Sequence, residues 1–141
     1  MDNELALLMC NLAQVRPGDI LLDPFCGTCS ILIAGTSLGA YCVGGDFDIK
    51  ILRGKKDQAG NPVTYVNSFQ QYSLNYSDLA WQDINHPGLK AGYFDAIVCD
   101  PPYNIRAGTR VENKNSKKNH FGVNCSLQSA KQLYLQLVKV A

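Results

Sequence analysis

Short apolar segments alternate with helical patterns along this chain, and the alternation restricts the fold more than any other feature of the sequence. Parallel strands need a crossover connection, so strands that alternate with helices predict βαβ units and a mainly parallel sheet. The strand candidates are residues 19–22, 41–46, 78–83 and 93–100, the last being broken at once by Pro101 and Pro102. The sequence therefore predicts an α/β fold.

The segments between the strands carry helical periodicity or helix-end signals. An opening helix follows Asp2 and Asn3, either of which can cap it, and a second helix over 30–39 closes at Gly39. A basic helix is predicted over 49–56, ending by residues 60–62, and a short helix over 65–74. Residues 104–125 are predicted to form a polar loop. A final helix follows, with apolar positions at Leu127, Ala130, Tyr134, Leu137 and Val138. No internal repeat or linker divides residues 1–141, so a single domain is expected.

Each strand candidate ends in or beside an acidic residue. The four acids are Asp23, Asp46, Asp83 and Asp100. One such residue alone is explained as a turn or cap residue, for which aspartate is commonly used. In parallel sheets, however, ligands bind outside the carboxyl ends of the strands. Four acids at equivalent strand ends therefore favour a shared crevice that binds a ligand rich in hydroxyls and amines.

Composition excludes several classes of protein. With 46% apolar and 18% charged residues, the chain can form a core. The opening "MDNELALLMC" has no basic region typical of a signal peptide, and no apolar run approaches a membrane span, so a cytoplasmic protein without membrane contact is expected. The net charge of +1 is too small to indicate a nucleic-acid surface by itself, so such a surface has to rest on local clustering.

The six cysteines leave one ambiguity. Cys10, Cys42, Cys99 and Cys125 lie far apart without metal-ligand spacing, so free thiols and no metal site are predicted. Cys26-Gly27-Thr28-Cys29 follows a strand candidate and precedes a helix, which is the setting of a thioredoxin-like dithiol centre. The same segment also suits a cofactor loop in which the cysteines are incidental.

Three motifs carry a family resemblance. "DPFCGTCS" (23–30), "GGDFD" (44–48) and "CDPPYNIRAGTR" (99–110), after the opening "MDNELALLMCNLA", resemble the catalytic domain of S-adenosylmethionine-dependent RNA methyltransferases, and in particular the tRNA (guanine-10-N2)-methyltransferase family. The resemblance extends from residue 1 to about 110. It implies a Rossmann-like S-adenosylmethionine-dependent methyltransferase fold with a mainly parallel sheet, and tRNA as the partner.

The resemblance assigns a cofactor site to the first three strand ends. The residues are Asp23, Phe25, Gly27, Thr28, Asp46, Phe47, Asp83 and Ile84. Gly27 would let the backbone approach the methionine moiety of the cofactor, and Asp46 would accept hydrogen bonds from the ribose hydroxyls. Phe47 would flank the adenine, while Asp83 and Ile84 would take its amine and cover its ring. Ordinary core packing explains Phe47 and Ile84 about equally well.

The "DPPY" segment would act on the target base. An exocyclic amine is a poor nucleophile because its lone pair is delocalised into the ring, so a carboxylate that accepts its hydrogen bond favours in-line attack on the methyl group. Asp100 would align the amine, Pro101 and Pro102 would hold the geometry, and Tyr103 would stack on the unstacked base. A strand terminator with a buried tyrosine explains each residue singly, but not the four together.

A basic cluster follows this motif. Arg106, Arg110, Lys114, Lys117 and Lys118, with His120, are predicted to guide RNA, although a solvated loop explains them equally well. The family's fold continues with further strands and often has a separate RNA-binding domain. We therefore expect a truncated domain without C-terminal strands and without an RNA-binding domain. The fourth strand would then form an edge of the sheet. We also expect an activating subunit or another chain that completes the sheet. A non-catalytic cofactor-binding fragment stays an alternative.

The methyltransferase interpretation is preferred over the dithiol one. A redox protein leaves Asp46, Asp83 and "DPPY" without roles, whereas the cofactor loop gives a role to each. In that loop Cys29 occupies a position where the family usually has glycine, so its side chain is expected to crowd the cofactor.

Overall fold

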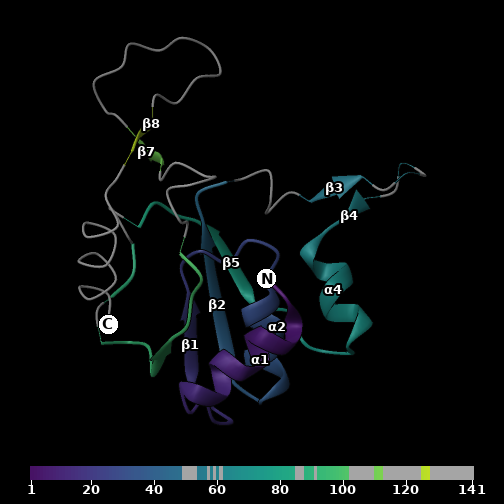
Figure 1. Ribbon diagram of the computed structural model, residues 1–141, viewed down its shortest axis with the longest axis vertical. Helices are drawn as coiled ribbons and strands as arrows, with labels where there is room; N and C mark the ends of the chain where they lie inside the picture. The colour runs from purple at the N-terminus through teal and green to yellow at the C-terminus, as the bar shows by residue number, and fades with distance from the viewer. Residues whose placement is uncertain are drawn as a thin grey trace.

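A four-stranded parallel sheet forms the centre of the chain in the computed structural model (Figure 1). The structure describes residues 1–48, 54–56, 58, 60, 62–84, 88–90, 92–101, 110–112 and 125–127. The strand order is β5-β2-β1-β6, with β1 at Ile20–Asp23, β2 at Tyr41–Asp46, β5 at Asp78–Trp81 and β6 at Ala96–Ile97. Every neighbouring pair is parallel, so all four carboxyl ends lie at one edge, as the sequence predicted.

Alternating residues of β1 face two separate apolar clusters. Leu21 packs into the larger cluster with residues of α1 (Asn3–Leu12), α2 (Ser30–Ser37) and α4 (Tyr65–Gln71), including the fully buried Phe69. Leu22 packs on the other side with Ile84 and the partly buried Ile97. Both faces of β1 therefore pack against apolar side chains, as expected for an interior strand of a parallel sheet.

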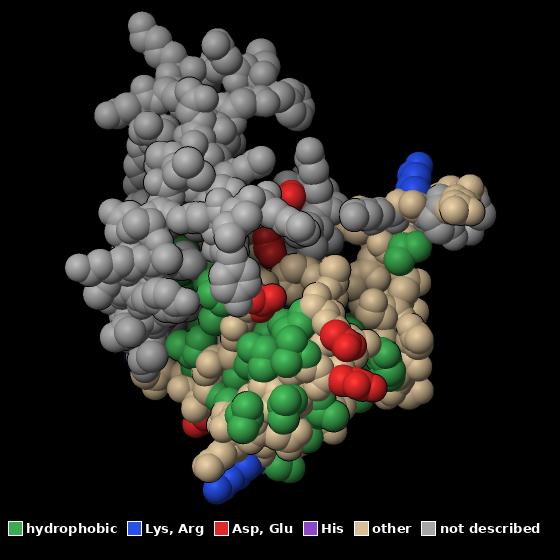
Figure 2. All heavy atoms as spheres, viewed as in Figure 1, with side chains coloured by type: hydrophobic (Ala, Val, Ile, Leu, Met, Phe, Trp, Pro, Cys, Tyr) green, Lys and Arg blue, Asp and Glu red, His purple; other side chains and the backbone are tan. Residues whose placement is uncertain are grey.

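Helix α1 buries small residues and exposes large ones. Its N-cap is Asp2, whose side chain accepts a hydrogen bond from the Glu4 amide, and the buried positions are Ala6 and Cys10. Cys10 lies close enough to α2 for its thiol to reach the Ile31 carbonyl (3.8 Å), and small side chains permit this approach. The exposed apolar residues include Leu5, Leu8 and Leu12. Apolar side chains accordingly gather over α1 and α2 in Figure 2.

Four of the sequence-based elements need correction. The basic helix over 49–56 does not reach its predicted end: Gly54 has a φ of +79°, and β3 (Lys55–Lys56) pairs antiparallel with β4 (Pro62–Val63). The strand over 93–100 is only the two-residue β6, because few of its residues have a partner strand. Within the predicted loop and helix, β7 (Arg110–Glu112) pairs with β8 (Cys125–Leu127). Residues 49–53 and 128–141 lie outside the described part of the chain.

Two further findings bear on the sequence-based expectations. Among the described strands, β6 forms one edge of the sheet, with β1 as its neighbour, as expected for the fourth strand. In the part of the chain that the structure describes, no helix combines the length and the apolar character needed to cross a membrane.

Candidate functional site

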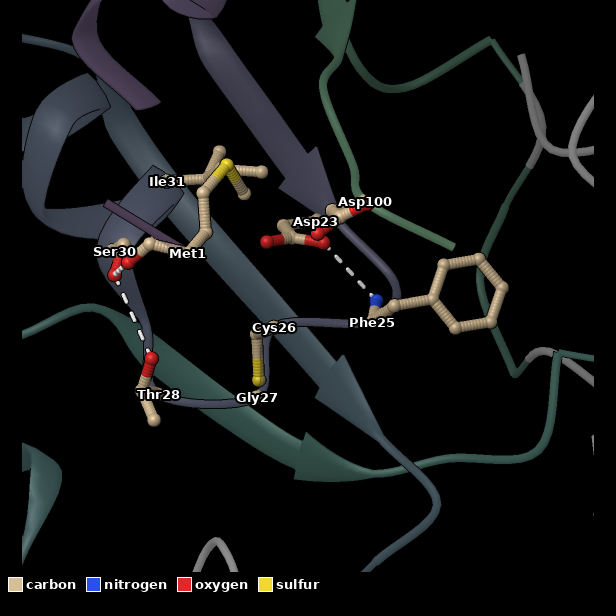
Figure 3. Close-up of a pocket in the computed structure, with 9 residues that line it drawn as sticks. All are labelled: Met1, Asp23, Phe25, Cys26, Gly27, Thr28, Ser30, Ile31 and Asp100. Carbon is tan, nitrogen blue, oxygen red and sulfur yellow. Dashed lines mark hydrogen bonds between the residues drawn. The ribbon is translucent and has the colours of Figure 1, made fainter. Parts of the chain in front are cut away.

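A pocket of about 280 Å³ opens at the carboxyl edge of the sheet, between β1 and the start of α2 (Figure 3). Its walls come from β1, the loop that follows it, α2, the N-terminal residue and the segment after β6. The lining residues are Met1, Asp23, Phe25, Cys26, Gly27, Thr28, Ser30, Ile31 and Asp100. The pocket thus joins Asp23, Phe25, Gly27 and Thr28, predicted from the first motif, with Asp100, predicted from the third.

The loop between β1 and α2 is held by hydrogen bonds to the side chain of Asp23 and to the backbone of β2. The Phe25 amide donates to the carboxylate of Asp23 (3.0 Å), and the Cys26 amide donates to the Gly45 carbonyl (2.9 Å). Gly27 has a φ of +47°, a conformation that glycine adopts without the steric cost of a side chain. This conformation brings the backbone of the loop to the pocket wall.

Asp46 links this loop to the end of β2. One oxygen of its carboxylate accepts from the Gly27 amide (2.9 Å) and the other accepts from the Asp48 amide (2.7 Å). A carboxylate oxygen has two lone pairs, so each oxygen can still accept a further hydrogen bond. Asp46 is therefore a structural connection between the two motifs as well as a candidate ligand-binding acid, a connection that sequence spacing alone does not predict.

Asp23 is the most deeply buried acid of the site. Its side chain is 1% exposed, and this burial raises its pKa to about 7, against the lowering effect of the Phe25 amide and with further increases from the nearby charges of Asp46 and Asp100. The charges of Asp46 and Asp100 thus reach Asp23, and Asp100 lines the pocket with it, whereas Asp46 lies behind the loop and does not line the pocket. A cationic group in the pocket would relieve their repulsion, so the site suits a ligand that carries positive charge.

The other predicted site residues lie in different settings. Asp83 and Ile84 are buried after β5 and do not line the pocket, although Ile84 packs in a cluster with Leu22 against which the pocket residue Phe25 also packs. Phe47 follows β2 and pairs with the ring of Trp81 at 6.0 Å between centroids. Pro101 directly follows Asp100 but is not among the residues that line the pocket.

Several predicted residues lie outside the described part of the chain. They are Pro102, Tyr103, Arg106, Lys114, Lys117 and Lys118. Arg110 is the first residue of β7. The RNA-binding and base-stacking assignments therefore stay predictions.

Sequence reasoning did not select Met1, Ser30 or Ile31, although all three line the pocket. The Ser30 hydroxyl donates to the Met1 carbonyl (3.1 Å) and lies 3.5 Å from the hydroxyl of Thr28. Ser30 begins α2, and first-turn residues of a helix at a strand end are regular ligand neighbours in parallel α/β folds. That position was the available signal for Ser30.

The two cysteines of the loop do not have the character of a redox centre. Cys26 and Cys29 are both buried free thiols. Hydrogen bonding with Cys29 and burial raise the pKa of the Cys26 thiol, with further increases from Asp46 and Asp23. A dithiol enzyme needs a thiolate, and hence a lowered pKa. The dithiol alternative therefore has no support in this loop.

Cys29 is strained, but it does not obstruct the pocket. Its backbone is left-handed, with φ of 67° and ψ of 20°, which accounts for the glycine usual at this position. Its side chain is 1% exposed in the core and is not among the residues that line the pocket. The expectation that this side chain crowds the cofactor is therefore wrong.

The strain at Cys29 gives a prediction that reverses the usual order of two substitutions. Cys29→Gly and Cys29→Ala both remove the buried thiol, but only alanine keeps a Cβ in the left-handed conformation. We expect the glycine variant to be more stable by about 1 kcal/mol, whereas alanine is ordinarily the more stable of the two. Urea unfolding measures the difference. A more stable alanine variant would contradict the backbone conformation described for residue 29.

Comparisons with known proteins identify the family to which the chain belongs. Residues 1–122 match the UPF0020 family, described as the RMKL-like methyltransferase domain. The tRNA (guanine(10)-N(2))-methyltransferase of Saccharomyces cerevisiae is 37% identical over 122 residues, which cover 84% of this chain and 27% of that protein. The chain thus spans about a quarter of the length of this relative.

Solved structures agree as well. TrmN from Thermus thermophilus superposes with a TM-score of 0.56 at 25% identity, covering 72% of this chain and 29% of that one. A putative S-adenosyl-L-methionine-dependent methyltransferase from Methanococcus maripaludis has the same fold, with a TM-score of 0.61 at 11% identity over 98% of this chain and 49% of that one. These matches confirm the resemblance that the motifs indicated and the Rossmann-like fold of S-adenosylmethionine-dependent methyltransferases. Because the family match includes all the described strands of the parallel sheet and the pocket at their carboxyl ends, the chain belongs to the UPF0020 family of RMKL-like methyltransferase domains.

Proposed function

We propose that this chain is the S-adenosylmethionine-binding catalytic domain of an RNA methyltransferase that acts on the N2 amine of guanine in tRNA. The observation that carries the proposal is the position of Asp100, which lines the same pocket as Asp23 and Gly27. A residue suited to align an amine thus lies beside residues suited to hold the methyl donor. The printed name of the yeast relative supports guanine N2 as the target.

The chain's own residues fit the cofactor by their chemistry. S-adenosylmethionine supplies an activated methyl group on a positively charged sulfur, together with an amino group, ribose hydroxyls and adenine. Asp23 lines the pocket and lies within reach of the charges of Asp46 and Asp100, so the site suits a ligand of positive charge. Asp46 retains lone pairs that can accept hydrogen bonds from the ribose hydroxyls. Asp23 lines the pocket, and we assign the amino group of the cofactor to its side. We assign the adenine end to Phe47, Asp83 and Ile84.

Asp100 would orient the target amine. By accepting a hydrogen bond from an N–H of the amine, its carboxylate would direct the nitrogen lone pair toward the methyl group. Pro101 and Pro102 would restrict the backbone at that point, and Tyr103 would stack on the flipped base. The basic residues Arg106, Arg110, Lys114, Lys117 and Lys118 would contact RNA phosphates. We further propose a cytoplasmic location and a protein subunit or chain that pairs with the edge strand β6.

The raised pKa of Asp23 predicts a pH dependence of cofactor binding. In the free protein the carboxyl group ionises with a pKa of about 7, and a cationic ligand favours the ionised form. The affinity for S-adenosylmethionine should therefore rise by about tenfold between pH 6 and pH 8, as measured by calorimetric titration. Titration of the ligand itself affects both proteins equally. Dividing the wild-type affinity by that of Asp23→Asn at each pH therefore leaves the pH dependence that is due to the Asp23 carboxyl group. A ratio that does not change with pH would contradict the role of Asp23.

The same carboxyl group gives an opposite effect on stability. Its pKa is higher in the folded protein than the value of about 3.9 for an unfolded chain, so ionisation opposes folding. The contribution of this carboxyl group to the free energy of unfolding is least unfavourable below about pH 4, and this free energy falls as the pH rises through about 7. Asp23→Asn should therefore be more stable than the wild type at pH 8 while binding the cofactor less tightly.

Methyl transfer to chemically matched tRNAs tests the proposed function. With radiolabelled S-adenosylmethionine, the chain should label a tRNA that has guanosine at position 10. It should not label the same tRNA with inosine there, because inosine lacks the N2 amine while keeping the rest of the purine. Equal labelling of the two tRNAs would exclude the N2 amine as the acceptor, and labelling of neither, with the cofactor shown to bind, would contradict methyl transfer to tRNA by this chain alone.

A further inference from the structure

Trp81, the only tryptophan of the chain, lies half-exposed at the carboxyl edge of the sheet, where the candidate site lies. It ends β5, and in the parallel ladder it is the register partner of Asp46, the last residue of β2. Its side chain is 52% exposed, although large aromatic residues are mostly buried. A half-exposed tryptophan beside the candidate ribose-binding acid suggests a role other than core packing.

Two hydrogen bonds from the end of β5 hold two successive carbonyls where β2 ends. The Gln82 amide donates to the Asp46 carbonyl (3.0 Å), and the indole Nε1–H of Trp81 donates to the Phe47 carbonyl (2.9 Å). The second bond lies beyond the end of the strand ladder, so it depends on the tryptophan side chain. Residues 46 and 47 are thus fixed from the β5 side.

The other side of the same turn is fixed by Asp46 itself. Its carboxylate accepts from the amides of Gly27 and Asp48 at 2.9 and 2.7 Å. The rings of Phe47 and Trp81 lie 6.0 Å apart at an interplanar angle of 38°, within the range of interacting aromatic pairs. The ribose-binding acid and the aromatic pair are therefore parts of one connected turn.

We propose that Trp81 is a positioning residue for the adenosine half of the cofactor: its N–H fixes the Phe47 backbone, and its ring forms with Phe47 an aromatic surface against the adenine. This inference rests on the proposed binding of S-adenosylmethionine and adds to it a residue outside the three motifs that carry the family resemblance. Asp46 supplies polar recognition of the ribose, while the aromatic pair supplies apolar recognition of the purine. The ligand class for this subsite is a purine nucleoside.

Because the protein has one tryptophan, its fluorescence reports on this subsite without any substitution. Saturating S-adenosylhomocysteine should shift the emission of the unmodified protein and reduce acrylamide quenching of Trp81 by at least about twofold, since the adenine would cover a half-exposed ring. Emission and quenching that do not change, with S-adenosylhomocysteine binding observed by calorimetry, would overturn the inference and leave the proposed function intact. Absence of binding by calorimetry would overturn both.

Substitutions separate the hydrogen bond from the ring. Trp81→Phe keeps an aromatic ring but loses the N–H, and should weaken S-adenosylhomocysteine about fivefold, as expected for one lost hydrogen bond. Trp81→Ala loses both the N–H and the ring, so it should weaken the binding of S-adenosylhomocysteine more than Trp81→Phe does. Tyr41→Ala is the matched control, because Tyr41 is 72% exposed at the opposite end of β2 and should leave affinity unchanged. Wild-type affinity in both Trp81 variants, with folding confirmed by urea unfolding, would overturn the assignment.

Discussion

Asp46→Ala is expected to abolish the thermal stabilisation that S-adenosylhomocysteine gives to the wild-type chain. At a ligand concentration of a hundred times Kd, binding should raise the wild-type midpoint by roughly 10 °C. The alanine variant loses the proposed acceptor for the ribose hydroxyls and also releases the amides of Gly27 and Asp48. Both the recognition group and the loop that lines the pocket are then disturbed, so affinity should fall by at least about a hundredfold. Thermal unfolding with and without ligand measures the effect.

Two controls make this result specific. Asp78→Ala also removes one negative charge, but from an exposed residue at the amino end of β5, and it should preserve the ligand-induced shift. Asp46→Asn keeps one oxygen acceptor and should retain a small part of the affinity. A full shift in Asp46→Ala, in a variant shown to be folded, would exclude Asp46 from the cofactor site.

Gly44→Val is expected to cause the largest loss of stability. A Cβ at Gly44 would lie 2.5 Å from a methyl group of Leu32, 2.5 Å from one of Leu79 and 3.1 Å from the Cβ of Cys26. The space is filled by α2, β5 and the cofactor loop together. Valine should lower the free energy of unfolding by roughly 3 kcal/mol or more, and alanine by about 1–2 kcal/mol. Chemical denaturation measures both values.

The environment of another glycine supplies the control. A Cβ added at Gly88 would meet no atom within 4 Å, and the backbone there is not left-handed, so Gly88→Ala should be close to neutral. Shortening a neighbour should make room at residue 44, so Leu79→Ala combined with Gly44→Ala should cost less than the sum of the two single changes. An additive double variant would indicate that the Cβ of residue 44 does not meet Leu79.

Much of the fold follows from local patterns. The predicted strand over 41–46 coincides with β2, and the predicted helix over 30–39 contains α2, because strand alternation, helical period and glycine stops all act over a few residues. The prediction over 93–100 overestimated β6, because strand length depends on which residues find a partner strand. The lysines at 55 and 56 form a strand instead of a helix end, since pairing with residues 62–63 overrides a weak local preference.

The site divides in the same way. Motif spacing by itself placed Asp23, Gly27, Asp46 and Asp100 at the carboxyl ends of parallel strands, because chain direction in a βαβ fold leaves no other edge for them. Only the tertiary structure decided that Asp46 would bind the Gly27 amide and that Asp23 would be buried among other acids. It alone also turned the Cys29 side chain into the core and brought Trp81 onto the Phe47 carbonyl. Such contacts join residues from different strands and loops, and their geometry depends on sheet order and packing, which no local pattern of residues encodes.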